Sequence, residues 1–152
     1  MEADPMNKTV VPNDMLLSEV GKLVDEGEKV VIMTKGISML PFIHGGKDSV
    51  LLVKPSSVDV GDIVLARIND ERYVLHRVIS REGDRFVLMG DGNLRGVERC
   101  SRKDISAVAV KILKKNGKTV DCCSIRNRRR AAFWAKLLPV RRWLLAIYRR
   151  II

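Results

Sequence analysis

Short β-type segments separated by turn residues restrict the fold of this chain more than any other feature. Residues 72–81, RYVLHRVISR, alternate with period two, so Val74, His76 and Val78 point to one face of a strand. Similar segments read KVVIMT, DSVLLVKP, DIVLARIN and RFVLMG, and ISAVAVKILKKNGKTV has the pattern of a hairpin turning at Asn116-Gly117. Short strands joined by tight turns predict a mainly β fold, an antiparallel sheet that is coiled or barrel-like.

One helix is predicted before the strands. Asn13 or Asp14 can cap it and Gly27 can end it. The apolar positions at helical spacing are Leu16, Val20, Leu23 and Val24. The chain of 152 residues is long enough for one domain with a real core. We predict a disordered N-terminus over 1–12, a single domain over 13–124, and a basic amphipathic helical tail over 125–152.

Positive charge is concentrated at the C-terminus. Residues 126–152 contain nine Lys or Arg and no acid; subtracting these from the totals of 28 basic and 18 acidic residues leaves 19 basic and 18 acidic residues before them, a net of +1. A nucleic-acid-binding domain would carry basic residues across its folded surface as well. The distribution therefore favours a local anionic partner for the tail and makes nucleic acid an unlikely partner of the domain.

The cysteines and the absence of targeting segments bear on location. Cys100, Cys122 and Cys123 lack metal-site spacing, and neighbouring cysteines seldom bond to each other, so we expect free thiols and no metal or other cofactor. No signal peptide is recognisable, and no apolar run approaches the roughly 20 residues of a membrane span. These features predict a cytoplasmic protein, or one peripheral on the cytoplasmic face of a membrane.

Four short motifs carry a family resemblance. Gly-Ile-Ser-Met-Leu-Pro (36–41), Gly-Asp-Ile-Val (61–64), His-Arg-Val-Ile (76–79) and Gly-Asp-Gly-Asn (90–93) follow in this order. Together they resemble the catalytic domain of type I signal peptidases and the related self-cleaving repressors, over roughly residues 30–112. The resemblance is closest to the branch in which histidine replaces the general-base lysine. It implies a coiled β fold and a serine endopeptidase. With the membrane attachment expected of the basic tail, we expect the substrate to be a leader or membrane-proximal peptide.

The resemblance implies Ser38 as nucleophile and His76 as general base. A serine hydroxyl needs a base within hydrogen-bond reach, and histidine can take its proton and return it to the leaving amine. A third residue would orient the imidazole. Asp91 matches the first acid of that branch, with Glu98 as the alternative, because Gly96 and Val97 stand where the branch has its later aspartate.

The resemblance also implies an oxyanion site and substrate contacts. Relatives have a serine two places before the nucleophile, but this chain has Gly36, so backbone amides near Gly36 and Ser38 would have to stabilise the oxyanion. The residues expected near the substrate pockets are Met39, Leu40 and Phe42. Lys47 interrupts the Gly-Asp pair that relatives place before the next strand, which changes the loop beside the site.

Each of these residues also has a structural interpretation. Ser38 can be a turn residue, His76 a half-buried side chain on a sheet face, and Asp91 a turn residue that bonds its own backbone. A rival function is therefore a peptide-binding module of the same fold whose catalytic site has decayed. A self-cleaving transcriptional regulator is disfavoured, because the roughly 30 residues before the first core strand hold one helix instead of a helix-turn-helix pair.

The tail has an apolar stripe at spacings of three and four, and Pro139 should kink or divide its helix. The stripe with bordering arginines and aromatics predicts a helix lying on an anionic membrane surface. A helix docked on the domain or on another subunit is the alternative, and RNA binding is a third. The residues expected to bind the membrane are Arg128, Arg129, Arg130, Trp134, Arg141, Arg142, Trp143, Arg149 and Arg150.

Overall fold

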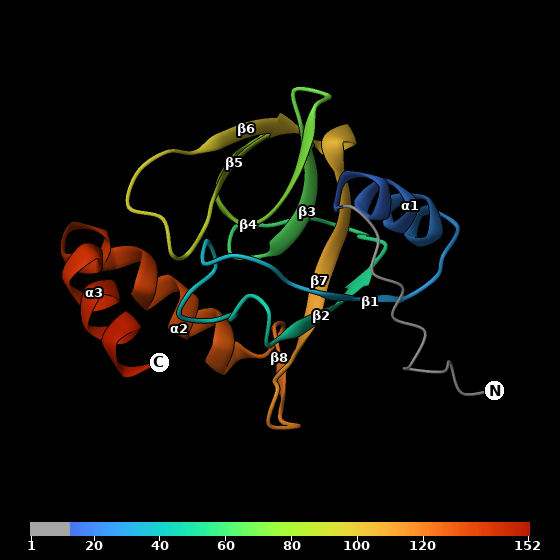
Figure 1. Cartoon of the computed structure of the whole chain (residues 1–152). Coiled ribbons are helices and arrows are strands. Elements are labelled where there is room, and N and C mark those ends of the chain that lie inside the picture. The colour runs from blue at the N-terminus through green and yellow to red at the C-terminus, as the bar shows by residue number, and fades with distance from the viewer. Residues whose placement is uncertain (1–12) are drawn as a thin grey trace.

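A curled antiparallel sheet forms the body of the computed structural model, which describes residues 13–152 (Figure 1). The strands are β1 (Val30–Met33), β2 (Ser49–Val53), β3 (Ile63–Ile68), β4 (Arg72–Glu82), β5 (Arg85–Met89), β6 (Glu98–Ser101), β7 (Ile105–Leu113) and β8 (Thr119–Asp121). Seven strands follow the order β1-β2-β7-β3-β4-β5-β6, and β8 pairs with β7. The prediction of a mainly β, antiparallel, coiled fold is confirmed.

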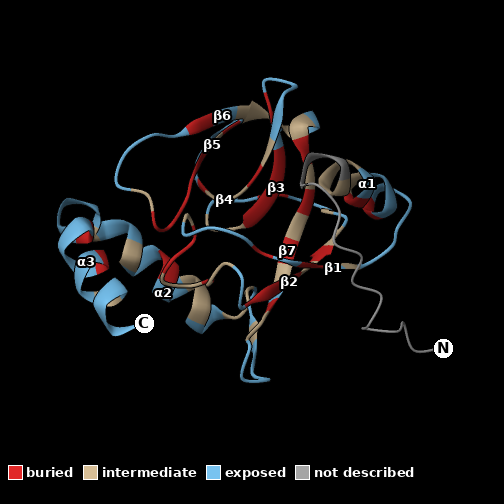
Figure 2. Cartoon of the chain, in the orientation of Figure 1, coloured by how far each residue is buried: buried red, intermediate tan, exposed pale blue. Residues whose placement is uncertain are grey.

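The sheet separates two clusters of buried hydrophobic residues. Figure 2 colours every buried residue of the chain red along the ribbon. Strand β4 contributes to both: Val74 and Val78 belong to one cluster, while Tyr73 and Leu75 pack against the other. His76 is buried and shares the face of Val74 and Val78, as the period-two pattern predicted. The alternation in the sequence thus fixes the side of the sheet on which each β4 residue lies.

Helix α1 (Asn13–Asp25) covers the cluster against which Tyr73 and Leu75 pack. Val20 and Val24 are buried there and Leu16 packs against them, as expected from their spacing. Leu23 is instead 42 % exposed, and Leu17 takes part in the packing. A helix buries a stripe and not every apolar position, so one of two adjacent candidates faces water. Gly27, with φ of +95°, allows the chain to turn after the helix.

The C-terminal part forms two helices. The hairpin of β7 and β8 turns at Gly117, whose φ is +89°, as predicted. Helix α2 (Ile125–Lys136) and helix α3 (Arg141–Ile151) follow, separated by a 3₁₀ turn over Leu138–Val140 that contains Pro139. They lie on the opposite side of the molecule from α1 (Figure 1). Within residues 13–152, no helix has the length and apolar character needed to span a membrane.

The three cysteines are free thiols with different surroundings. Cys123 is exposed, whereas Cys100 and Cys122 are partly buried. Burial raises the pKa of Cys100 and of Cys122 to about 11. Since the thiolate is the reactive form, neither should react readily near neutral pH.

We therefore expect iodoacetamide at pH 8 to modify Cys123 well before Cys100 or Cys122. Burial both blocks access to the two other thiols and keeps them protonated. Peptide mapping by mass spectrometry after timed quenching measures the order. Equal labelling rates at all three cysteines in the folded protein would contradict the burial described here, and a urea-unfolded sample supplies the reference rates.

Candidate active site

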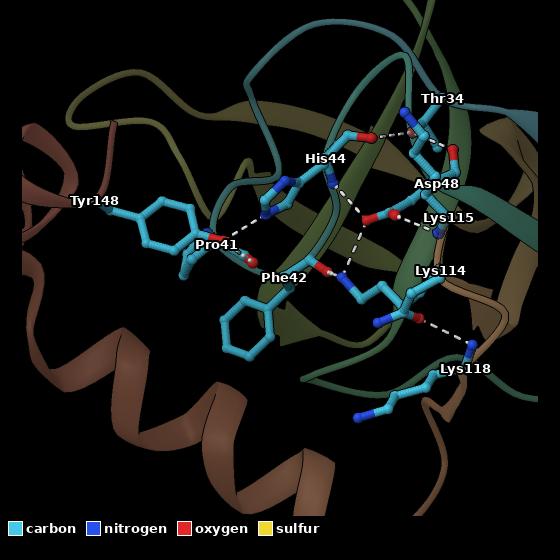
Figure 3. Close-up of polar contacts among 10 residues, drawn as sticks. Thr34, Pro41, Phe42, His44, Asp48, Lys114, Lys115, Lys118 and Tyr148 are labelled. Atoms are coloured by element: carbon cyan, nitrogen blue, oxygen red, sulfur yellow. Dashed lines mark hydrogen bonds and ion pairs between the residues drawn. The ribbon is translucent and has the colours of Figure 1, made fainter. Parts of the chain in front are cut away.

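The loop that carries Ser38 is clamped at both ends. It connects β1 to β2, and Thr34 N–H and Thr34 Oγ1 both donate to the Asp48 carbonyl, at 3.1 and 2.8 Å. The Asp48 carboxylate is buried and accepts from His44 N–H at 2.8 Å and Lys114 Nζ at 3.0 Å (Figure 3). Burial opposes ionisation of this carboxyl, but these donors outweigh it and lower its pKa. The loop is therefore held by a buried anion at its base.

The Gly-Asp-Gly-Asn turn after β5 presses directly against Ser38. Gly92 N–H donates to the Ser38 carbonyl at 2.8 Å. A Cβ added to Gly90 would lie 2.3 Å from the Ser38 carbonyl oxygen, and one added to Gly92 would lie 2.3 Å from the Ile37 carbonyl oxygen. Both approaches are too close for any side chain. The two glycines are thus needed because two backbones meet at this point.

Strand register brings His76 and Glu98 to one face. Val78 pairs with Leu88, and Leu88 pairs with Glu98, so these three side chains share a face. His76 is two residues before Val78 on the same strand and points the same way. His76 Nδ1 contacts the Glu98 carboxylate, and both residues are buried. Glu98, the alternative third acid, is therefore the acid that lies against the imidazole.

Asp91 makes a different ion pair. Its two carboxylate oxygens accept from Arg77 Nε at 2.8 Å and Arg77 Nη2 at 2.7 Å, and the side chains are only 5 % and 11 % exposed. Arg77 Nη1 also donates to the Gly61 carbonyl at 2.8 Å. Asp91 thus joins the glycine turn to β4 and to the Gly-Asp-Ile-Val segment. The sequence analysis favoured Asp91 as the acid that contacts the His76 imidazole. In the structure the Asp91 carboxylate pairs with Arg77 instead.

Ser38 and His76 line one pocket of about 380 Å³. Its apolar lining includes Ile32, Met39 and Leu65, and Gly36 contributes backbone. Gly36 has φ of +75°, which the bend before Ser38 requires. Among the described residues, no hydrogen bond joins the Ser38 and His76 side chains. The pocket nevertheless gathers a hydroxyl, an imidazole and an apolar wall.

The residues expected to contact substrate divide into two groups. Met39 lines the pocket and is also buried in the core. Leu40 is 2 % exposed and does not line this pocket. Phe42 packs edge-on against Trp134, with ring centroids 6.4 Å apart, and lies under the Arg77 guanidinium. Leu40 and Phe42 therefore serve the packing behind the loop.

The tail helices contact the same loops. Trp134 Nε1 donates to the Asp91 carbonyl at 2.7 Å, and Arg141 Nη1 donates to the Asn93 carbonyl at 3.1 Å. Tyr148 OH contacts His44 Nε2 in the loop that connects β1 to β2 (Figure 3). Burial, together with Lys114, lowers the pKa of His44, so the imidazole in this contact favours its neutral form. The tail is docked on the domain, which was the alternative interpretation of its sequence.

Three residues of the predicted membrane-binding set bond to the domain. Arg141 is 4 % exposed, Trp134 is bonded to Asp91, and Arg128 Nη2 donates to Asp62 Oδ1 at 2.7 Å. Helical spacing alone could not show which side of each helix would meet the domain. Sequence reasoning also missed Arg77 as the partner of Asp91. Its position beside His76 on β4 was the available signal, since adjacent strand residues face opposite ways.

The fold and pocket define a class, a curled β domain with a serine and a histidine at one cavity. The family model described as Peptidase S24-like matches residues 2–111, so the chain belongs to the Peptidase S24-like family. The chain is also 36 % identical over 86 residues to a LexA repressor of Herpetosiphon aurantiacus. That match covers 51 % of this chain and 40 % of the repressor, so the chain spans less than half of that relative.

We expect Asp91→Asn to lower the free energy of unfolding by about 3–5 kcal/mol, because Arg77 would remain buried without its counter-charge. Urea denaturation followed by circular dichroism measures this change. The matched control is Asp59→Asn, which removes a carboxylate from an exposed pair with Arg81 and should cost no more than about 1 kcal/mol. Equal, small losses for both variants would contradict a buried structural role for Asp91.

Proposed function

We propose that the protein is a serine endopeptidase in which Ser38 is the nucleophile, His76 the general base and Glu98 the acid that orients the imidazole. The observation that carries the proposal is the contact of His76 Nδ1 with the buried Glu98 carboxylate beside a pocket that Ser38 also lines. With Nδ1 directed at Glu98, Nε2 is left for the Ser38 hydroxyl. This is the division of labour of a catalytic triad.

The reaction follows from these roles. Ser38 Oγ attacks the peptide carbonyl as its proton passes to His76 Nε2, which forms a tetrahedral intermediate. His76 then gives that proton to the leaving amine, and the acyl group remains on Ser38. Water, deprotonated by His76, attacks the acyl carbon, and the proton returns to Ser38 as the carboxylate product leaves. Substrate binding would bring Ser38 Oγ and His76 together, since catalytic hydrogen bonds often tighten in the complex.

Backbone amides supply the oxyanion site in this proposal. The Ser38 N–H donates to no backbone acceptor in the described residues 13–152, and Gly36 lines the same pocket. An amide that is already held in place needs no reorganisation when negative charge develops. Gly36 would contribute by holding the bend that aims the Ser38 amide. In this proposal the oxyanion is stabilised without a hydrogen bond from any side chain.

The substrate proposed is an extended peptide from a leader or a membrane-proximal segment. The pocket is partly apolar and of modest size, which suits small side chains near the cleaved bond. The match to a LexA repressor favours a second candidate, a self-cleaving regulator whose scissile bond lies in this chain. A catalytically inactive peptide-binding module of the same fold is the outcome if Ser38 performs no chemistry.

Ser38→Ala should reduce peptide cleavage by at least about 10³-fold, because the nucleophile is lost. Incubation with a mixed peptide library, followed by mass spectrometry of the products, measures this rate. Ser57→Ala is the control, since Ser57 is exposed and outside the pocket. Cleavage that continues unchanged in Ser38→Ala would refute the nucleophile assignment.

The same experiment separates the three functions. A self-cleaving chain shortens without added peptide, at a rate that does not depend on protein concentration. A peptidase acting on other chains leaves its own mass intact and cleaves library peptides. An inactive module does neither, and its Ser38 also resists acylation by a β-lactam or lipopeptide-type inhibitor.

Glu98→Gln should lower the maximal cleavage rate by about 10²–10⁴-fold while the protein stays folded. A glutamine can hold the ring but cannot stabilise the imidazolium that forms during attack. The comparison is Asp91→Asn, measured at a temperature where it is fully folded, which should retain most activity because its role is structural. The opposite ranking of the two variants would make Asp91 the third member of the site.

A further inference from the structure

Helix α3 keeps an apolar face in water after it has docked. The side chains on its docked side are Arg141, Leu145 and Tyr148. On another side lie Trp143, Ile147 and Ile151, one turn apart, with exposed fractions of 60 %, 58 % and 77 %. Three large apolar side chains in one row exceed the scattered single residues that a protein surface normally exposes. Docking on the domain therefore leaves the row of Trp143, Ile147 and Ile151 exposed to water.

Arginines of the tail are exposed as well, and residues 126–152 contain no acidic residue that could pair with them. Arg142, Arg149 and Arg150 are exposed, and the Arg142 guanidinium lies 4.6 Å from the Trp143 ring centroid. On α2, Phe133 is 65 % exposed and stands within one turn of Arg129 and Arg130. Residues 126–152 contain no Asp or Glu. The exposed side of the tail is thus both apolar and positively charged.

We propose that the exposed face of α3 binds the surface of an anionic lipid bilayer, with α3 lying in the plane of the interface. Apolar side chains would enter the acyl boundary and the arginines would meet lipid phosphates. Trp143 suits the boundary itself, since its ring is apolar and its N–H is polar. This inference does not depend on the peptidase proposal, because no residue of the pocket takes part.

Other occupants fit the face less well. A second copy docked through a two-fold axis would bring the same arginines together without any acid to pair them. A nucleic acid would use the arginines and could stack on Trp143, but it has no use for exposed Ile147 and Ile151. An anionic bilayer uses both the charge and the aliphatic side chains.

Co-sedimentation of the full chain with vesicles tests the proposal. The protein should pellet with phosphatidylcholine vesicles that contain phosphatidylglycerol, and weakly with pure phosphatidylcholine. The double variant Arg149→Gln/Arg150→Gln should bind the anionic vesicles roughly 25-fold less, at about fivefold for each arginine. Ile147→Glu should lose most of its binding. The matched control is Leu23→Glu, an exposed leucine on α1 at the other side of the molecule (Figure 1), which should bind normally.

A spectroscopic readout guards against misfolded variants. Tryptophan emission should shift to the blue when anionic vesicles are added, and Trp143→Phe should remove this shift while retaining binding. Thermal melts identical to wild type establish that each variant is folded, and Ser38→Ala should bind as wild type does. Equal binding to neutral and anionic vesicles, or no binding to either, would overturn the proposal. Dimers broken by Ile147→Glu, or capture of an oligonucleotide without vesicle binding, would overturn it as well.

Discussion

The site depends on the contact of two backbones, where the glycine turn after β5 meets the segment that carries Ser38. Gly92 N–H donates to the Ser38 carbonyl, and neither Gly90 nor Gly92 has room for a Cβ. This contact fixes the position of Ser38 relative to β5, and hence to the rest of the sheet. Asp91, between the two glycines, ties the turn to Arg77 on β4 through two charge-assisted hydrogen bonds. The Gly-Asp-Gly motif is thus a joint between loop and sheet, and Asp91 is part of that joint.

The register of the strands positions Glu98 relative to His76. The pairings of Val78 with Leu88 and of Leu88 with Glu98 put an acid from the edge strand β6 on the face that His76 occupies. A slip of one residue in either pairing would send Glu98 to the opposite face. Adjacent residues of β4 consequently have separate tasks: His76 points toward Glu98, and Arg77 on the other face holds the turn beside Ser38. The His-Arg pair of the motif therefore serves both sides of the sheet.

Most of the fold could be predicted from the sequence because the strands are short, patterned and separated by turn residues that need left-handed φ, as at Gly117. Strand β6 (Glu98–Ser101) was not predicted, because its four residues show no alternation of apolar and polar side chains. The sequence also singled out Ser38 and His76 as candidate site residues through the family resemblance of their motifs, and both residues line the same pocket. The motifs could not show which acid contacts the His76 imidazole. Asp91 and Glu98 lie close together in the sequence, and only the register of the strands distinguishes them. The sequence also could not predict which side of the tail helices contacts the domain. These helices are apolar or cationic almost all round, so spacing could not tell that Leu145 is buried and Ile147 exposed.

The tail connects the proposed membrane face to the pocket through few side chains. Tyr148 on the docked side of α3 contacts His44, which belongs to the loop that carries Ser38, while Ile147 beside it in sequence is exposed. Trp134 and Arg141 bond the carbonyls of Asp91 and Asn93, on the turn that touches Ser38. A bilayer that received the exposed face would therefore hold the helices whose other side supports the site.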